Sequence, residues 1–382
     1  MPAILSKLLE GASLFIAPNG WKYIVMIIVG LVLIGLAVFK KFEPMLLLPI
    51  GFGCILCNIP LSHAVGESGF LKILYDMGIA NELFPVLLFI GIGAMIDFDP
   101  LFTQPVTLFF GAAAQFGIFM AMLLAVSCNF FLAVPFTIRE AAAIGIIGAA
   151  DGPSAIMIGS MFAPKYMGSI MVAAYSYMAL VPLIQPPVIR ALTTRNERMI
   201  RMKLVEKKAP KYIKVLFPLV VTIIAGIVAP LSTSLIGALM FGNFIKECGV
   251  TDKLSQTAQN ELNSIVTLLL GITIGSTMRA QDFLTTHTIL ILFIGLLAFV
   301  FDTAGGVVFA KIVNLFLPQK SKINPMVGAC GISAFPMSAR VIQKMAQKED
   351  PGNFILMPAV GANVAGQVGS IIAAAMILSI FG

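Results

Sequence analysis

Apolar segments separated by short polar stretches follow one another along nearly the whole chain. They lie at about 21–39, 45–60, 84–97, 105–134, 140–163, 168–189, 215–230, 232–245, 264–278, 287–316, 324–343 and 354–381. A helix needs about 20 consecutive apolar residues to cross a bilayer, and several of these segments are shorter or are interrupted by Gly and Pro. The pattern therefore predicts an all-α polytopic membrane protein in which full spans are mixed with broken or re-entrant helices.

The composition supports the same class. Hydrophobic residues make up 59% of the 382 residues, charged residues make up 11%, and the mean hydropathy is +0.98. A soluble domain carries about 25% charged residues, and it could not cover this much apolar surface, whereas a lipid bilayer can. The chain has room for about ten spans or half-spans.

An internal repeat organises the apolar segments. Asn-Glu-Leu occurs at 81–83 and again at 260–262, and the pattern G-x2-G-x4-P occurs at 145–153 and again at 328–336. The offsets are 179 and 183 residues, and both matches come in the same order. We interpret this as two related halves whose Gly- and Pro-broken helices meet near the bilayer midplane. Because duplicated transporter halves are often inverted, we predict inverted repeats.

A basic linker joins the two halves, which we place at residues 1–190 and 215–382. Nine Lys and Arg residues fall within 190–214, opposed only by Glu197 and Glu206. Short basic loops between spans face the cytoplasm, which predicts a cytoplasmic linker at 191–214 in a bacterial inner-membrane protein. Since this stretch accounts for the net charge of +7, the charge is no signal of nucleic-acid binding.

The cysteines and the short motifs exclude several other kinds of chemistry. Cys54 and Cys57 form a CxxC, but they lie in an apolar run of a chain that has only two histidines. We therefore expect buried small residues there rather than a metal or redox pair. The sequence contains no P-loop, no nucleophile elbow, no zinc-ligand spacing and no Met-Lys-Met sequence for attaching biotin.

Asp151 is the main candidate for chemistry. It lies in GIIGAADGPSAIMIG, more than ten residues from any basic residue in the sequence. A carboxylate inside a membrane is costly, and it usually faces a cavity and marks an ion or proton path. Asp-Gly-Pro also begins a helix well, so Asp151 could serve as its N-cap. Capping and cation binding can coexist, and we favour a functional role for Asp151.

The second broken segment carries Asn324, Ser333 and Arg340 in INPMVGACGISAFPMSARV. Asn and Ser supply neutral oxygens, which suit a monovalent cation that must be released again. Arg340 could hold an anionic group, or it could extend to the membrane interface as Lys and Arg side chains often do.

Other polar positions fall among small residues near the ends of the two halves. Asn363 and Gln367 lie in GANVAGQVGS, where a close-packed helix interface is an equally good interpretation. Tyr175 and Tyr177 are either site phenols or part of an aromatic belt. Asp302 is a second acidic residue in an apolar segment, and the sequence assigns it no role.

Four motifs resemble one protein family. GAADGPSAI, VAAYSYMALVPLIQPP, SAFPMSARV and GANVAGQVGS are similar to segments of the beta subunits of sodium-translocating biotin-dependent decarboxylases, which act on oxaloacetate, glutaconyl-CoA, methylmalonyl-CoA or malonate. The resemblance runs from about residue 80 to the C-terminus. It implies that the chain decarboxylates carboxybiotin, which a partner carrier supplies, and exports Na+ with consumption of a proton. From the resemblance we expect the chain to lack much of the N-terminal extension of oxaloacetate-type members, which would favour an acyl-CoA decarboxylase.

The resemblance also implies roles for individual residues. Asp151, Asn324, Ser333 and Asn363 would bind Na+, and Arg340 and Gly328 would bind carboxybiotin. Tyr177, with Asp151 and Arg340, would act in decarboxylation and proton transfer. The implied partners are a biotin carrier protein, a carboxyltransferase subunit and a small membrane-anchor subunit, in a homo-oligomer such as a trimer.

A secondary Na+-coupled transporter of an organic anion is the alternative. Related halves, broken helices and a Na+ site fit such a transporter equally well. The two functions differ in their partners, because only the decarboxylase needs a biotin carrier and a carboxyltransferase.

Overall fold

The structure is a computed structural model that describes residues 11–41, 43–66, 68–103, 105–132, 134–202, 209–228 and 230–382. Every regular element within these ranges is a helix, which confirms the predicted all-α class. Five of the described helical segments are long and apolar enough to cross a membrane, and two bent pairs bring the number to seven.

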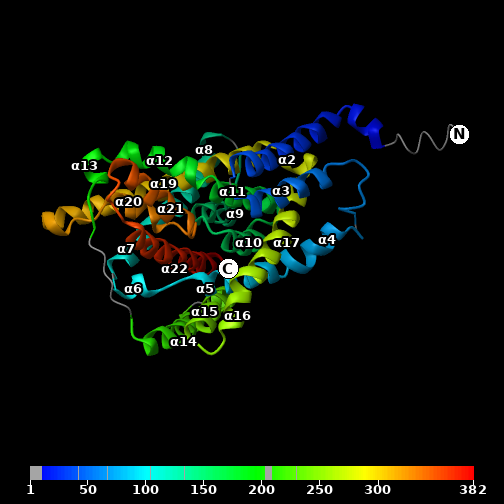
Figure 1. Cartoon of the computed structure of the whole chain (residues 1–382). Helices are drawn as coiled ribbons and strands as arrows, with labels where there is room; N and C mark the ends of the chain where they lie inside the picture. Colours follow the sequence, from blue (N-terminus) through cyan, green and yellow to red (C-terminus); the bar gives the residue numbers. More distant parts are fainter. Residues whose placement is uncertain are drawn as a thin grey trace.

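The helices of the seven candidate spans can be followed in Figure 1. The straight ones are α2 (Gly20–Lys40), α7 (Val106–Ala114) with α8 (Phe116–Phe131), α14 (Lys211–Val228), α19 (Thr286–Phe316) and α22 (Leu356–Phe381). The bent pairs are α4 (Phe70–Leu74) and η1 (Tyr75–Ile79) with α5 (Leu83–Met95), at 61°, and η3 (Pro164–Tyr166) and α11 (Met167–Ala179) with α12 (Val181–Leu192), at 70°.

The elements come in the same order in the two halves. Each half has a helix pair, a π-helical turn before an apolar helix, a short helix, a long helix, a broken helix and a final apolar segment. In the first half these are α2 with α3 (Pro44–Cys57), η1 with α5, α6 (Asp99–Thr103), α7 with α8, residues 138–162, and α11 with α12. In the second half they are α14 with α15 (Thr233–Glu247), η5 (Ala258–Leu262) with α17 (Asn263–Ser276), α18 (Ala280–Phe283), α19, residues 325–349, and α22.

The register of this repeat follows only one of the two sequence matches. The π-helical turns η1 and η5 begin 183 residues apart, which is also the offset between the two G-x2-G-x4-P patterns. Asn-Glu-Leu follows the first turn but ends the second, so the two triplets are not structurally equivalent. Inversion of the halves stays a prediction.

The halves exchange packing partners. Helix α3 of the first half packs on α17, and α15 of the second half packs on α5. The backbones approach so closely that a Cβ atom on Gly53 would lie 2.2 Å from the Ile272 carbonyl oxygen, and one on Gly242 would lie 2.0 Å from that of Ile90. The packing therefore runs across the predicted boundary between the halves.

Each broken helix turns back on itself. The first hairpin consists of α9 (Ile138–Gly145), η2 (Ile146–Ala149) and α10 (Gly152–Phe162), and the second consists of α20 (Pro325–Gly328), η7 (Ala329–Gly331) and α21 (Met337–Glu349). Phe136 and Tyr166, which flank the first hairpin, have ring centroids 5.7 Å apart. Asn324 and Asn353, which flank the second, both donate to the Arg198 carbonyl oxygen, at 2.8 and 3.3 Å.

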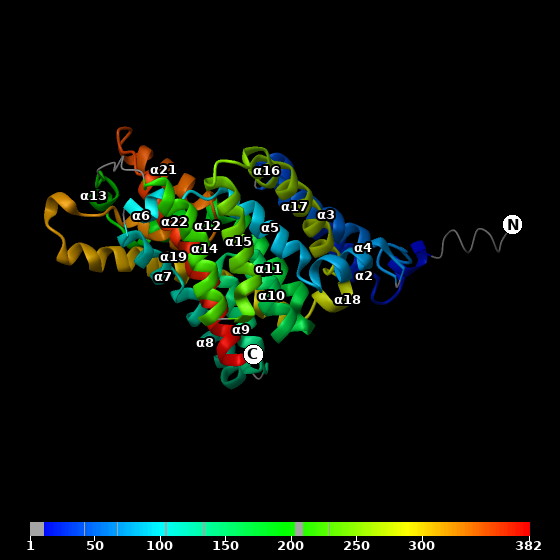
Figure 2. The same cartoon turned by 90° about the horizontal axis from the view of Figure 1, so that it is seen from below.

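The two hairpins enter from opposite faces of the molecule. The long helix α19 runs from one face to the other. At its start, His287 stacks on Tyr166, which flanks the first hairpin, with ring centroids 5.4 Å apart. Lys311, near the end of the same helix, donates to the Leu192 carbonyl oxygen at 3.0 Å, beside the linker. Figure 2 shows α13 (Arg195–Arg198) and α21 at one edge and α8 and α9 at the other. We call these the linker face and the far face.

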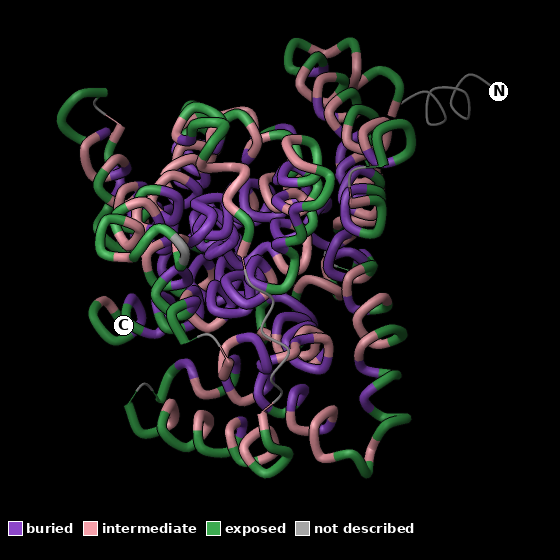
Figure 3. Tube along the Cα trace, turned by 60° about the vertical axis from the view of Figure 1, so that its left-hand side comes forward, coloured by how far each residue is buried: buried purple, intermediate pink, exposed green. Residues whose placement is uncertain are grey.

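Ion pairs fasten the described part of the linker to the end of the second hairpin. Arg198 contacts Glu349 at 2.8 Å, and Arg201 contacts Asp350 at 2.8 Å. The hydrogen bonds from Arg201 lower the pKa of Asp350 below its ordinary value. Buried residues lie mainly in the middle of the molecule, and exposed residues lie mainly at its periphery (Figure 3). The fold thus places both hairpins in the interior.

Candidate functional site

The two hairpins touch at their breaks. The backbone N–H of Ser333 donates to the carbonyl oxygen of Ala149 at 3.3 Å. Ala150 has a left-handed conformation (φ 52°), and Asp151 then occupies the N-cap position of α10, which begins with Gly152 and Pro153. The predicted meeting of two broken helices is therefore present, and Asp151 lies at it.

The Asp151 carboxylate is buried and receives hydroxyl donors from two elements. Only 3% of the residue is exposed. Its Oδ2 accepts from Ser154 Oγ of α10 at 2.5 Å and from Ser370 Oγ of α22 at 3.2 Å. No basic side chain within the described residues forms an ion pair with it. A buried carboxylate without a basic partner is stabilised by taking up a proton or by binding a cation.

A cavity of about 170 Å³ adjoins Asp151. It is lined by both breaks, by the start of α3 and by α5, α11, α17 and α22. Its polar lining residues are Glu43, Asp151, Tyr175, Asn263, Thr267, Ser333 and Gln367. Oxygen donors of this kind are the ligands that a hard cation prefers. Among the described residues there is no group of three or more His, Cys, Asp and Glu that could hold a transition metal.

Ser333 lines this cavity, and Asn363 contacts the backbone of the residue before it. The Ser333 hydroxyl donates to the Gly366 carbonyl oxygen at 3.0 Å, and Asn363 Nδ2 donates to that of Ile332 at 2.6 Å. Asn363 Oδ1 is buried and has no hydrogen-bond partner among the described residues. The structure thus brings Asp151, Ser333 and Asn363 together around the breaks.

Asn324 and Gly328 do not line this cavity, and their predicted roles in binding Na+ and carboxybiotin stay predictions. Asn324 is the N-cap of α20, at the opposite end of this arm from the break, and its Oδ1 accepts from Met326 N–H at 3.1 Å. Its Nδ2 donates to the linker, so both ends of the carboxamide already have partners. A Cβ atom on Gly328 would lie 2.0 Å from the Gly306 carbonyl oxygen, so this glycine permits close packing on α19 and does not line the cavity.

The two tyrosines of α11 have different surroundings. Tyr175 lines the cavity, whereas the Tyr177 hydroxyl donates to the Leu292 carbonyl oxygen at 2.5 Å and Tyr177 is not among the lining residues. The two tyrosines therefore have different neighbours, and the role of Tyr177 in proton transfer stays a prediction. Their positions differ because two residues along a helix correspond to about 200° of rotation.

Arg340 is exposed on α21. Its charge acts on Glu43, which lines the cavity. Burial raises the pKa of Glu43 above its ordinary value, and the positive charge of Arg340 acts in the opposite direction. A cationic side chain in this position is suited to binding an anionic group that approaches the cavity.

Several site residues were missed or left undecided by the sequence interpretation. Ser370, four residues after Gly366, was interpreted as part of a small-residue packing face, yet it donates to Asp151. Ser154 and Thr267 were not considered. The spacing of Asn363, Gln367 and Ser370 on one helix face was the available signal, because residues four and seven apart share a face.

Two other buried acidic residues, Asp99 and Asp302, have structural partners. Asp99 forms an ion pair with Lys214 and accepts from the Ala209 N–H at 3.0 Å. Asp302 accepts from the Gly117 N–H at 2.7 Å. The five cysteines are free, and of the CxxC pair Cys54 is buried and Cys57 is half-buried.

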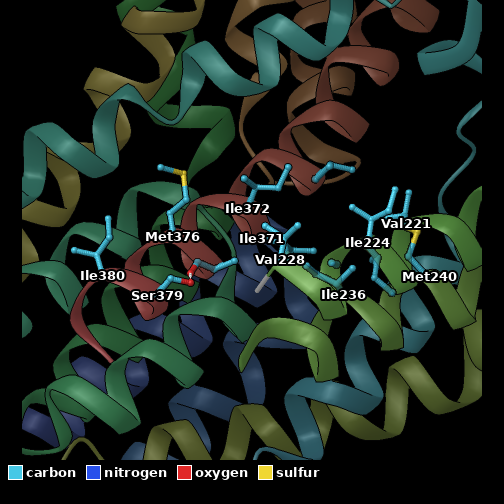
Figure 4. Close-up of a pocket in the computed structure, with 14 residues that line it drawn as sticks. Val221, Ile224, Val228, Ile236, Met240, Ile371, Ile372, Met376, Ser379 and Ile380 are labelled. Atoms are coloured by element: carbon cyan, nitrogen blue, oxygen red, sulfur yellow. Dashed lines mark hydrogen bonds between the residues drawn. The ribbon is translucent and has the colours of Figure 1, made fainter. Parts of the chain in front are cut away.

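A larger cavity, of about 550 Å³, lies between α14, α15 and α22. Figure 4 shows side chains such as Ile224, Val228 and Ile372 around it. Its one hydroxyl lining residue, Ser379, donates to the carbonyl oxygen of Ala375 at 2.9 Å. The lining of this cavity is otherwise apolar, whereas the smaller cavity adjoins the buried Asp151 carboxylate.

Comparisons with known proteins agree with the sequence resemblance. The sequence model described as Na+-transporting oxaloacetate decarboxylase beta subunit matches residues 22–381. Glutaconyl-CoA decarboxylase subunit beta of Acidaminococcus fermentans is 48% identical, over 95% of this chain and 94% of its own. Methylmalonyl-CoA decarboxylase subunit beta of Veillonella parvula is 48% identical, over 93% and 92%. Oxaloacetate decarboxylase beta chain 2 of Salmonella typhi is 43% identical, over 98% of both chains.

Proposed function

The chain belongs to the family of Na+-transporting oxaloacetate decarboxylase beta subunits, and from this we propose that it decarboxylates carboxybiotin supplied by a partner and couples the reaction to Na+ export. The observation that carries the proposal is the buried Asp151 carboxylate at the meeting of two hairpin breaks, beside a cavity lined with oxygen donors. A secondary transporter of an organic anion remains the alternative, but family membership favours the decarboxylase.

Na+ is the transported substrate, and Asp151, Ser333 and Asn363 are its proposed ligands. Asp151 supplies the one negative charge that balances a monovalent cation. Ser333 and Asn363 supply neutral oxygens that can release the ion again. This assignment is supported by the contact between the breaks and by the unpartnered Asn363 Oδ1.

The proposed reaction breaks the bond between the biotin ring nitrogen and the carboxylate carbon. CO2 leaves, and the nitrogen takes up a proton, so one proton is consumed. Arg340 would hold the anionic carboxylate at the entrance of the cavity, beside Glu43. The role of Tyr177 in passing the proton stays a prediction.

Coupling follows from the charge of Asp151. When Asp151 carries a proton it is neutral, and it then binds Na+ more weakly, which favours release. Moving one charge against 100 mV costs about 2.3 kcal/mol, so the site must be closed to one side whenever it is open to the other. A displacement of the hairpins against the helices that line the cavity would provide this alternation.

The orientation and the partners are part of the proposal. The basic linker, at 191–214, faces the cytoplasm of a bacterial inner membrane, from which carboxybiotin arrives. The partners are a biotin carrier protein, a carboxyltransferase subunit and a small membrane-anchor subunit, and the chain forms a homo-oligomer such as a trimer. An acyl-CoA substrate for the whole complex is supported by the 48% identity to acyl-CoA decarboxylase subunits, against 43% for the oxaloacetate type.

The test is the decay of carboxybiotin in the presence of the purified chain, with and without Na+. We expect Na+ to stimulate decay, and we expect Asp151→Asn to abolish the stimulation, because the substitution removes the charge that binds the ion. The matched control is Asp252→Asn, at an exposed position in α16 (Asp252–Thr257). Retained Na+ dependence in Asp151→Asn would disprove the assignment. The absence of decay in folded wild-type protein would favour the transporter, to be tested by uptake into liposomes.

A further inference from the structure

We propose that Tyr175 and Gln367 are two further oxygen ligands of the transported Na+. The inference rests on the proposed Na+ site at Asp151, and it concerns which groups complete that site and set its affinity.

The evidence begins with two buried oxygens that have no partner. Tyr175 is 1% exposed and Gln367 is 4% exposed, and both line the cavity beside Asp151. The Tyr175 hydroxyl and Gln367 Oε1 form no hydrogen bond within the described part of the chain. Buried polar atoms are nearly always paired, because an unpaired one costs about 1–3 kcal/mol. A ligand in the cavity would remove this cost for both atoms at once.

The position of Tyr175 is fixed by the residue next to Asp151. A Cβ atom on Gly152 would lie 2.1 Å from Tyr175 Cζ and 2.5 Å from its hydroxyl oxygen. The phenol therefore lies directly against the backbone at the start of α10, one residue from the carboxylate. Any side chain at position 152 would overlap the Tyr175 ring. The Asp-Gly-Pro sequence therefore positions both the Asp151 carboxylate and the Tyr175 hydroxyl.

Gln367 is fixed from the other hairpin. Its Nε2 donates to the carbonyl oxygen of Ser333, at the second break. Because a carbonyl can only accept, this contact assigns the nitrogen to Ser333 and leaves Oε1 as the free end of the carboxamide. The free oxygen thus belongs to a side chain whose orientation is already set.

Together these groups suit a monovalent cation. Asp151 contributes one negative charge, and the hydroxyl and the carboxamide add neutral oxygens without adding charge. A divalent cation would keep a net positive charge inside the membrane, which is unfavourable. Asp151 belongs to the first hairpin, Tyr175 to α11 and Gln367 to α22, and Gln367 also donates to Ser333 of the second hairpin. The set is therefore complete only while the two breaks are in contact, which links ion binding to the hairpin arrangement.

The experiment compares Tyr175→Phe and Gln367→Met with Tyr212→Phe and Gln347→Met. The first pair removes one oxygen-bearing group each from the cavity with little change in volume. The second pair makes the same changes at exposed positions, where Tyr212 is 71% exposed. Two quantities are measured on the full chain: the Na+ concentration for half-maximal stimulation of carboxybiotin decay, and the rise in melting temperature caused by Na+ relative to choline.

We expect each cavity variant to raise the half-saturating Na+ concentration about tenfold, which corresponds to about 1.4 kcal/mol, and to retain its rate at saturating Na+. The Na+-induced rise in melting temperature should fall in the same variants. Unchanged half-saturation in Tyr175→Phe, or a lost maximal rate with unchanged half-saturation, would overturn the assignment. If Gln367→Met does not fold, Gln367→Asn takes its place.

The two proposals fail in different ways. If Na+ stabilises the wild type but carboxybiotin does not decay, the decarboxylase function is wrong. The ligand assignment is then tested by whether the Na+-induced rise in melting temperature is smaller in the cavity variants than in the exposed controls. If wild-type decay is stimulated by Na+ and the cavity variants behave like the exposed controls, only the ligand assignment is wrong.

Discussion

At the scale of single residues, Asp302 shows how a buried carboxylate can be structural. Helix α8 begins directly after α7, and Gln115 between them provides no side-chain cap. Asp302 reaches across from α19, and its Oδ1 accepts from the Gly117 N–H at the start of α8, where the helix dipole favours negative charge. A Cβ atom on Gly117 would lie 2.2 Å from this oxygen. Asp302 therefore serves as the N-cap that the local sequence of α8 lacks.

This role predicts a clear difference between two substitutions. Asp302→Asn keeps an oxygen that can accept from Gly117, whereas Asp302→Ala leaves that buried N–H without a partner. We expect Asp302→Ala to lower the free energy of unfolding by about 1–3 kcal/mol and Asp302→Asn to lower it clearly less. The half-saturating Na+ concentration should not change in Asp302→Asn. A loss of Na+ stimulation in folded Asp302→Asn would instead place this residue on the ion path.

At the scale of elements, the sequence predicts where the helices break but not how their arms pack. The G-x2-G-x4-P pattern locates both breaks, because Gly and Pro interrupt a helix wherever they occur. Which tyrosine of α11 faces Asp151 depends on the rotation of that helix, which its packing and the 70° bend before α12 determine. Asn324, nine residues before Ser333, is followed by Pro325, which is a helix-start signal, but such a signal does not show whether the capping residue also binds an ion. These assignments depend on contacts between distant segments.

Gly328 provides the prediction at this scale. The Cβ atom in Gly328→Ala would lie 2.0 Å from the Gly306 carbonyl oxygen, so α20 would have to move away from α19. Overpacking of this kind costs about 1–3 kcal/mol. The control is Gly35→Ala in α2, where the nearest atom, Phe39 Cδ2, would be 3.9 Å away. We expect a lower melting temperature in Gly328→Ala and an unchanged or slightly higher one in Gly35→Ala, since Ala favours helix. Equal melting temperatures would contradict the close packing of α20 on α19.

At the scale of the whole molecule, composition predicts the amount of membrane-embedded helix but not its topology. A short apolar segment that crosses the bilayer and one that turns back inside it have the same hydropathy. The return of each hairpin is established only by contacts at its ends, such as the Phe136 and Tyr166 rings and the Asn324 and Asn353 amides on Arg198. For the same reason, the exchange of α3 and α15 between the halves was not predictable.

The topology leads to a prediction that the sequence alone could not make. Both ends of one hairpin should be accessible from the same side of the membrane, and the two hairpins from opposite sides. Single cysteines at exposed positions test this: Arg139→Cys and Lys165→Cys flank the first hairpin, and Ser321→Cys and Lys348→Cys flank the second. The background is the full chain with its five cysteines replaced, and the probe is a membrane-impermeant maleimide. In intact cells, we expect the first pair to react and the second pair to react only after permeabilisation, because the linker is proposed to be cytoplasmic. If the broken helices crossed the membrane, the two members of each pair would react from opposite sides. If the two members of each pair reacted from the same side, but the second pair reacted in intact cells and the first only after permeabilisation, the hairpins would be confirmed. The cytoplasmic placement of the linker would then be wrong.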